Sequence, residues 1–172
     1  PGLGADSIAA ASTAGIIGTI LVIVFMIATY GVLGLFANIA MLINVSFTIA
    51  ILSALGATLT LPGIAGIVLS VGMAVDANVL IYERIREEQR QGRSAISAIE
   101  TGFTKAIGTI TDSNLTTLIA ALVLFFFGTG PIRGFAVTLA IGNVTSFFTA
   151  VTVTRWIVAQ WVRTVRPARV PI

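Results

Sequence analysis

Long apolar runs, separated by short polar or glycine-containing turns, dominate this chain. Five of them are long enough to cross a membrane as helices, at about residues 8–29, 35–55, 61–82, 110–127 and 135–158. A helix rises about 1.5 Å per residue, so roughly 20 residues span a hydrocarbon core of about 30 Å. The pattern predicts an all-α fold, a polytopic transmembrane helical bundle of five spans, with Asp6 and Ser7 capping the first.

The third apolar run, residues 61–82, contains a single ionisable residue, Asp76. A carboxylate exposed to lipid costs several kcal/mol, so Asp76 must face protein or water and is a candidate functional residue. In the same run Gly66, Ser70 and Ala74 recur every four residues. Small residues at this spacing let helices approach closely and predict a helix-packing seam. We expect Asp76 to lie on or beside that seam.

A charged stretch, residues 83–108, follows this run and is predicted to form a cytoplasmic loop. Residues 83–91 are expected to continue the helix into solvent, with Gly92 ending it and the arginines solvated. From Ser94 onward, apolar residues recur at helical spacing. These residues are Ile96, Ile99, Phe103, Ile107 and Ile110. Their pattern predicts a separate amphipathic helix lying in the membrane interface.

The fourth run opens with a polar cluster around Asp112. On a helix, Asp112 shares a face with Thr109 and Thr116. Two interpretations stay open, a helix cap at the interface and a working acid. Asp76 is expected about 10 Å from the inner surface, and Asp112 near the same depth. If their helices are neighbours, the two acids could form a proton relay.

The fifth run carries a polar stripe at alternating spacings of four and three residues. Its members are Thr138, Gly142, Thr145, Thr149, Thr152 and Arg155. A polar seam of this length predicts a bundle interior or a wetted path. The basic tail, residues 159–172, is expected to be irregular.

Composition and charge support a membrane protein and give it an orientation. Hydrophobic residues make up 56% of the chain and charged residues 10%, against roughly 25% in soluble domains. Nine of the ten basic residues fall on one side of the predicted spans, which predicts an outer N-terminus and a cytoplasmic C-terminus. The net charge of +3 therefore reflects topology rather than nucleic-acid binding.

The absence of cysteine and histidine excludes disulfides, thiol chemistry and the usual zinc sites within these 172 residues. Any proton chemistry must therefore use carboxylates, and we expect no metal and no catalytic residue. The chain begins with Pro1 rather than Met, so we expect it to be an internal piece of a longer protein.

The run GMAVDANVLIYERIREE, residues 72–88, resembles the signature of the SecD branch of the SecD/SecF protein-export family. The likeness continues through residues 3–8, 61–70 and 98–142, nearly the whole chain. The paired SecF subunit carries a different acidic segment at the equivalent place, so this form favours SecD. The resemblance implies membership of the proton-driven RND transporter superfamily.

The resemblance implies a membrane subunit of the bacterial Sec preprotein translocase in the inner membrane. It would use the proton-motive force, with SecF, to assist late, ATP-independent export of unfolded preproteins through SecYEG. SecA would act indirectly, and YidC and YajC would be further partners. The subunit would not be an enzyme and would need no cofactor beyond a coupling ion, H⁺, or Na⁺ as in some relatives. One further membrane helix and a large extracytoplasmic domain would precede the part seen here.

The family's transmembrane acid corresponds to Asp76, in a matching DAN segment that includes Asn78. By the same resemblance Asp112 and Asn114 line the ion path, and Arg133 has a structural role in a turn. Two alternatives remain. An RND-type exporter of lipids or drugs would need larger loops than residues 56–60 and 128–134. A non-conducting translocon scaffold would make Asp76 a structural group.

Overall fold

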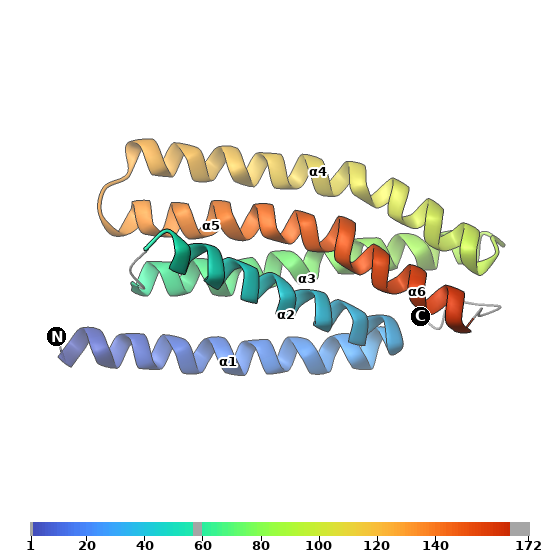
Figure 1. Ribbon diagram of the computed structural model, residues 1–172, viewed down its shortest axis with the longest axis horizontal. Coiled ribbons are helices and arrows are strands. Elements are labelled where there is room, and N and C mark those ends of the chain that lie inside the picture. The colour runs from blue at the N-terminus through green and yellow to red at the C-terminus, as the bar shows by residue number, and fades with distance from the viewer. Residues whose placement is uncertain (1, 57–59, 166–172) are drawn as a thin grey trace.

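The computed structural model describes residues 2–56 and 60–165 of the chain, with side chains from residue 4 onward, and this part is helical with short turns (Figure 1). The helices are α1 (Gly2–Tyr30), α2 (Val32–Ala54), α3 (Leu61–Arg90), α4 (Ala95–Phe127) and α5 (Pro131–Phe148), followed by the π-helix η1 (Thr149–Thr154) and α6 (Arg155–Val165). Among the described residues five helical rods are long and apolar enough to cross a membrane, the last running from Pro131 to Val165 through η1. The predicted all-α bundle is confirmed.

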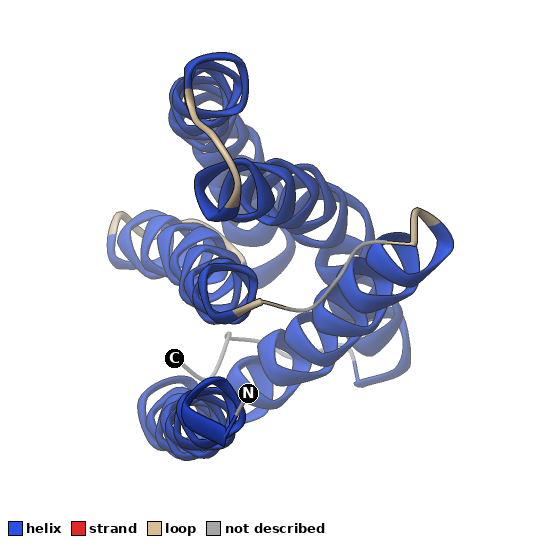
Figure 2. Ribbon diagram, turned by 90° about the vertical axis from the view of Figure 1, so that its left-hand side faces the viewer, coloured by secondary structure: helices blue, strands red, loops and turns tan. Residues whose placement is uncertain are grey.

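Helix α3 is the centre of the bundle, since it packs against α1, α2, α4, α5 and η1. Helix α1 lies at the edge of the bundle. The view along the bundle shows it beside the label N (Figure 2). Thr60 caps α3, because its hydroxyl Oγ1 accepts the backbone N–H of Gly63 at 3.2 Å, and Pro62 occupies the first turn. After the helix ends at Arg90, Gly92 adopts φ +91°, a value that favours glycine. The residues that the sequence indicated for the start and the end of this helix therefore lie at its two ends in the structure.

The connection between α1 and α2 is tighter than expected, with Gly31 alone separating the two helices. Gly31 has φ +60°, and a Cβ at Gly34 would collide with the backbone of Met26. These two glycines let the chain reverse at once and bring the helices into contact. At its other end α1 begins at Gly2, so Asp6 and Ser7 lie inside the helix and the predicted cap is wrong. No proline separates Gly2 from the apolar run, so the helix begins before the predicted cap.

Helix α4 is a single helix where the sequence predicts two. Ser94 caps it by accepting the backbone N–H of Ser97 at 3.3 Å, and no break separates the amphipathic part from the fourth span. The separate interfacial helix is not confirmed. Phe103 and Ile110, expected on its membrane face, are 1% and 3% exposed in the protein core. At Gly102 the helix comes so close to Ile85 of α3 that an added Cβ would lie 2.9 Å from its backbone nitrogen.

The polar stripe of the last helical rod follows the prediction only in part. Thr138, Gly142, Thr145 and Thr149 are buried, whereas Thr152 and Arg155 are exposed. The change falls within η1, whose wider π turns shift the phase of the residues that follow. Helix α6 continues to Val165, so residues 159–165 are helical rather than irregular, and the remaining tail, 166–172, lies outside the described residues.

Candidate functional site

One face of α3 packs tightly against α5 through small residues. A Cβ added at Gly66 would lie 2.9 Å from Cγ2 of Thr138, and one added at Gly142 would lie 2.6 Å from Cβ of Ser70. Both distances are shorter than van der Waals contact, so only glycine fits. The structure therefore places Gly66 and Ser70 of the expected seam against α5, and Ala74 is buried as well.

Asp76 does not lie on that seam. It follows Ala74 by two residues, which is a rotation of about 200° around the helix, and it faces α4. There it lines a cavity of about 180 Å³ between the two helices. The lining residues are Met73, Asp76, Ala77, Leu80, Thr109, Ile110, Ser113, Asn114 and Thr117. Of the four expected ion-path residues, Asp76 and Asn114 line this cavity and Asn78 and Asp112 do not.

The α4 wall of the cavity is polar. Thr109, Ser113 and Thr117 are spaced by four residues, so their hydroxyls share one face of the helix. The amide Nδ2 of Asn114 is buried and has no hydrogen-bond partner among the described residues. A cavity with this volume and these donors and acceptors can hold a few water molecules. Asp76, which is exposed in this chain, therefore borders a partly open cavity whose α4 wall is polar and whose α3 wall includes the apolar residues Met73 and Leu80.

A buried asparagine of α5 supports this wall from behind. Nδ2 of Asn143 donates to the backbone carbonyl of Asn114 at 2.7 Å, and Asn143 is 2% exposed. The contact ties α5 to α4 at the depth of the cavity. Sequence reasoning missed Asn143, although an amide inside a long apolar run is itself a sign of an interhelical hydrogen bond.

Asn78, two residues beyond Asp76, faces a different neighbour. It is 2% exposed, and its Oδ1 accepts a hydrogen bond from the Thr154 hydroxyl at 3.0 Å. Thr154 is the last residue of η1. The structure thus gives Asn78 a contact that ties α3 to the π-helical segment, on a side of α3 away from the cavity.

Asp112 is exposed and lies in the middle of α4, where its backbone carbonyl accepts the Thr116 hydroxyl at 2.9 Å. The cap interpretation is wrong, because α4 begins 17 residues earlier, at Ala95. Its part in a relay with Asp76 stays a prediction. The expected structural role of Arg133 agrees with its contacts. Its Nε donates to the carbonyl oxygens of Phe125 and Gly128, at 3.0 and 3.1 Å, across the turn between α4 and α5.

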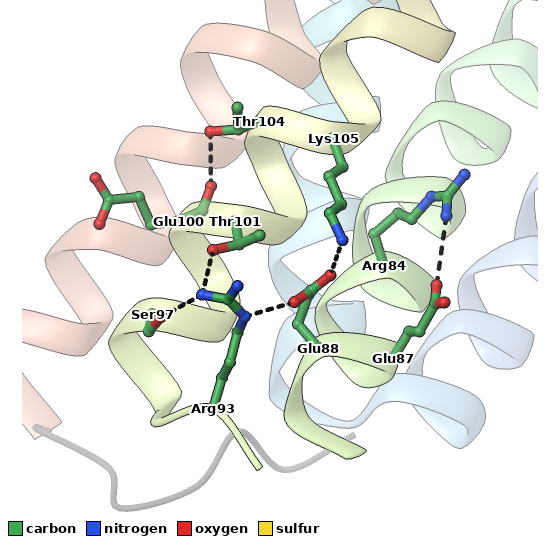
Figure 3. Close-up of polar contacts among 9 residues, drawn as sticks. All are labelled: Arg84, Glu87, Glu88, Arg93, Ser97, Glu100, Thr101, Thr104 and Lys105. Carbon is green, nitrogen blue, oxygen red and sulfur yellow. Dashed lines mark hydrogen bonds and ion pairs between the residues drawn. The ribbon is translucent and has the colours of Figure 1, made fainter. Parts of the chain in front are cut away.

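The charged end of α3 holds a buried ion-pair cluster that sequence reasoning missed (Figure 3). Glu88 is 1% exposed and pairs with Arg93, Nε to Oε2 at 2.7 Å, and with Nζ of Lys105. The expectation that residues 83–91 extend into solvent is wrong for Glu88, because α4 folds back over it. Its spacing of three residues from the buried Ile85 could have indicated this. The neighbouring pair of Arg84 and Glu87, by contrast, is exposed.

Comparison with known proteins identifies the family. Residues 1–164 match the model of the family described as "Protein export membrane protein SecD/SecF, C-terminal". The protein translocase subunit SecD of Rickettsia prowazekii is 55% identical over 169 residues, and the subunit SecDF of Brucella abortus is 51% identical over 169. A crystal structure of SecDF from Thermus thermophilus, a translocon-associated membrane protein, superposes with a TM-score of 0.94 at 44% identity and covers the whole chain.

The matches cover nearly all of this chain but a minor part of each relative. The aligned region is 98% of the chain and 33% of the Rickettsia SecD, or 22% of the Brucella SecDF. For the Thermus SecDF structure it is 24% of that protein. The five membrane helices around Asp76 thus occur within larger export subunits, and the chain belongs to the SecD/SecF family as a fragment of its membrane domain.

Proposed function

We propose that this chain is the membrane segment of a SecD-type subunit of the bacterial Sec preprotein translocase. Together with SecF it uses the proton-motive force to assist late, ATP-independent export of preproteins through SecYEG in the inner membrane. Support comes from the family match and from relatives named as protein translocase subunits. The N-terminus of the segment lies outside and its charged end faces the cytoplasm.

The observation that carries the proposal is the position of Asp76 on a cavity between α3 and α4 whose α4 wall carries hydroxyl groups. An acid within a membrane-spanning segment is costly and marks ion pathways and proton relays. Taking up a proton removes its charge, and the two forms differ by several kcal/mol in a medium of low dielectric constant. That difference is enough to bias a helix between two packings. Because α3 contacts most of the bundle, its rearrangement would move the neighbouring helices.

The coupling ion in this proposal is H⁺, and Na⁺ is the alternative. The carboxylate of Asp76 takes up and releases the ion, and the hydroxyls of α4 hold water along its path. Partner residues of SecF complete the path, because Asp76 is the only acid among the described residues that line the cavity.

The test compares Asp76→Asn with wild type in the full-length protein complexed with SecF. Inverted membrane vesicles are given an imposed proton gradient after ATP is exhausted, and protease-protected preprotein is measured. We expect the gradient-dependent part of export to disappear, since asparagine keeps the shape of the side chain but cannot take up a proton. Co-purification of SecF shows whether the complex still assembles.

Asp112→Asn is the matched control, since it makes the same chemical change on α4 outside the cavity lining. We expect it to keep most of the gradient-dependent export. Loss in both variants would support the relay of two acids. Unchanged export in Asp76→Asn would contradict the proposal and favour a non-conducting scaffold.

A further inference from the structure

A groove separate from the Asp76 cavity runs between the first turns of α4 and helix α6. It has a volume of about 410 Å³. Its lining residues are Ile96, Ile99, Glu100, Phe103, Arg155, Ala159, Val162 and Arg163. Figure 1 shows both segments at the end of the bundle where α3 becomes charged. The groove therefore lies where the apolar spans give way to charged residues, which is the depth of lipid headgroups.

The groove combines an apolar wall with exposed apolar residues at its rim. Phe103 is 1% exposed and forms part of its floor, whereas Ile96 is 64% exposed. Trp156, which follows Arg155 but does not line the groove, is also 64% exposed. Tryptophan is enriched at membrane–water interfaces, where its ring lies at the level of the headgroups. These features suit an acyl chain that enters beside a polar headgroup.

Three charged side chains line the groove without pairing with one another. Arg155, Arg163 and Glu100 make no ion pair within 4.0 Å among the described residues. This differs from the adjacent Glu88, whose carboxylate is held by two cations. In Figure 3 the side chain of Glu100 points away from that cluster. The guanidinium of Arg155 lies 5.7 Å from the ring centroid of Phe103, which holds the charge against the apolar floor.

We propose that this groove binds a phospholipid with an amine headgroup, phosphatidylethanolamine. The guanidinium groups of Arg155 and Arg163 bind the phosphate, for which arginine provides several N–H donors in a planar array. The carboxylate of Glu100 accepts N–H bonds from the ammonium group, and one acyl chain covers the apolar wall. A bound lipid would connect α4 to α6 at the charged end of the bundle.

The two signs of charge in the groove favour this lipid over others. Phosphatidylglycerol has a phosphate for the arginines but would leave Glu100 without a cation. Phosphatidylcholine has a positive headgroup but no N–H to donate to the carboxylate. Free inorganic phosphate could bind the arginines but would leave the apolar wall exposed. Of the ligands compared, phosphatidylethanolamine alone matches the arginines, the carboxylate and the apolar wall.

The test uses the full-length protein in complex with SecF, purified and stripped of lipid in detergent. Native mass spectrometry then follows the binding of added phosphatidylethanolamine, phosphatidylglycerol and phosphatidylcholine. We expect one site that prefers phosphatidylethanolamine. The double variant Arg155→Gln/Arg163→Gln should weaken this binding by about tenfold or more, as expected for lost charge-assisted hydrogen bonds. Arg90→Gln removes a positive charge at the same end outside the groove and should leave the binding unchanged.

If the double variant fails to assemble, Glu100→Gln still tests the proposal. We expect this variant to fold, because the exposed side chain of Glu100 has no structural partner in the described part of the chain. We expect it to abolish the preference for phosphatidylethanolamine over phosphatidylglycerol while binding of the phosphate persists. The proposal is overturned if the three lipids bind alike. It is equally overturned if Arg90→Gln weakens binding as much as the double variant, or if Glu100→Gln leaves the preference intact. The outcome does not depend on the proposed role of Asp76.

Discussion

Helix α3 contacts its neighbours α5 and α4 in opposite ways. Toward α5, small residues bring the helices so close that a single added methyl group at Gly66 or Gly142 has no room. Toward α4, at the depth of Asp76, the helices leave a cavity whose α4 wall carries hydroxyl and amide groups. One helix thus has a side that fixes its position and a side that keeps an acid accessible.

The separation of α3 from α4 is confined to the depth of Asp76. At the charged end the two helices touch at Gly102 and Ile85 and are linked by the Glu88 cluster. Between the charged end and the middle of the bundle, contact gives way to the cavity. This arrangement lets a change at Asp76 act on the spacing of two helices that remain joined at one end.

Gly142→Ala, in the close contact between α3 and α5, is expected to have the largest effect on stability. The new methyl group would overlap Cβ and Oγ of Ser70, and overpacking of this kind costs about 1–3 kcal/mol. We expect a lower melting temperature and a lower yield of the full-length complex with SecF, measured by thermal-shift and size-exclusion assays. Gly72→Ala is the control, because its added Cβ would meet nothing within 4 Å. Equal losses in both variants would contradict the close contact of α3 with α5.

Glu88→Gln, at the charged end where α3 and α4 are linked, is expected to have an intermediate effect on stability. The change leaves Arg93 and Lys105, whose side chains are 46% and 50% exposed, without their shared anion. We expect a lower melting temperature, by less than for Gly142→Ala because water can solvate both cations. The matched variant Arg84→Gln breaks an exposed pair, which is typically worth about 0–1 kcal/mol. If the two variants melt alike, the buried cluster does not hold α3 to α4.

Thr117→Val, in the lining of the cavity between α3 and α4, is expected to have the smallest effect on stability. Valine keeps the shape of threonine, so stability should change by no more than about 0.5 kcal/mol. If the cavity carries the coupling ion, losing a hydroxyl from its lining should lower gradient-dependent export severalfold, which is less than Asp76→Asn. Thr116→Val loses the same type of in-helix hydrogen bond but does not line the cavity, and should export normally. Equal export by both variants would show that the cavity wall does not matter.

Local sequence signals predicted much of this structure. Apolar runs of about 20 residues specified five membrane helices, because backbone polar groups in lipid must be satisfied within a helix. Glycine and proline marked the limits of α3. The isolated charge of Asp76 indicated a side chain that must avoid lipid. Each signal depends on residues close together in the chain.

Contacts between distant residues decided the rest. The sequence could not show that Asp76 faces α4 while the seam faces α5, because helix rotation depends on the neighbours. It placed Asp112 near Asp76 in depth, but only the packing of α4 shows that Asn114, and not Asp112, reaches the cavity. The π-helical segment left Thr152 and Arg155 of the predicted polar stripe exposed, and the reversal of α4 buried Glu88. The sequence by itself determined which apolar segments form long helices and which groups need a polar partner, since hydrophobicity and backbone chemistry act locally. Only the tertiary structure decided which partner each group has, because that depends on how five helices pack together.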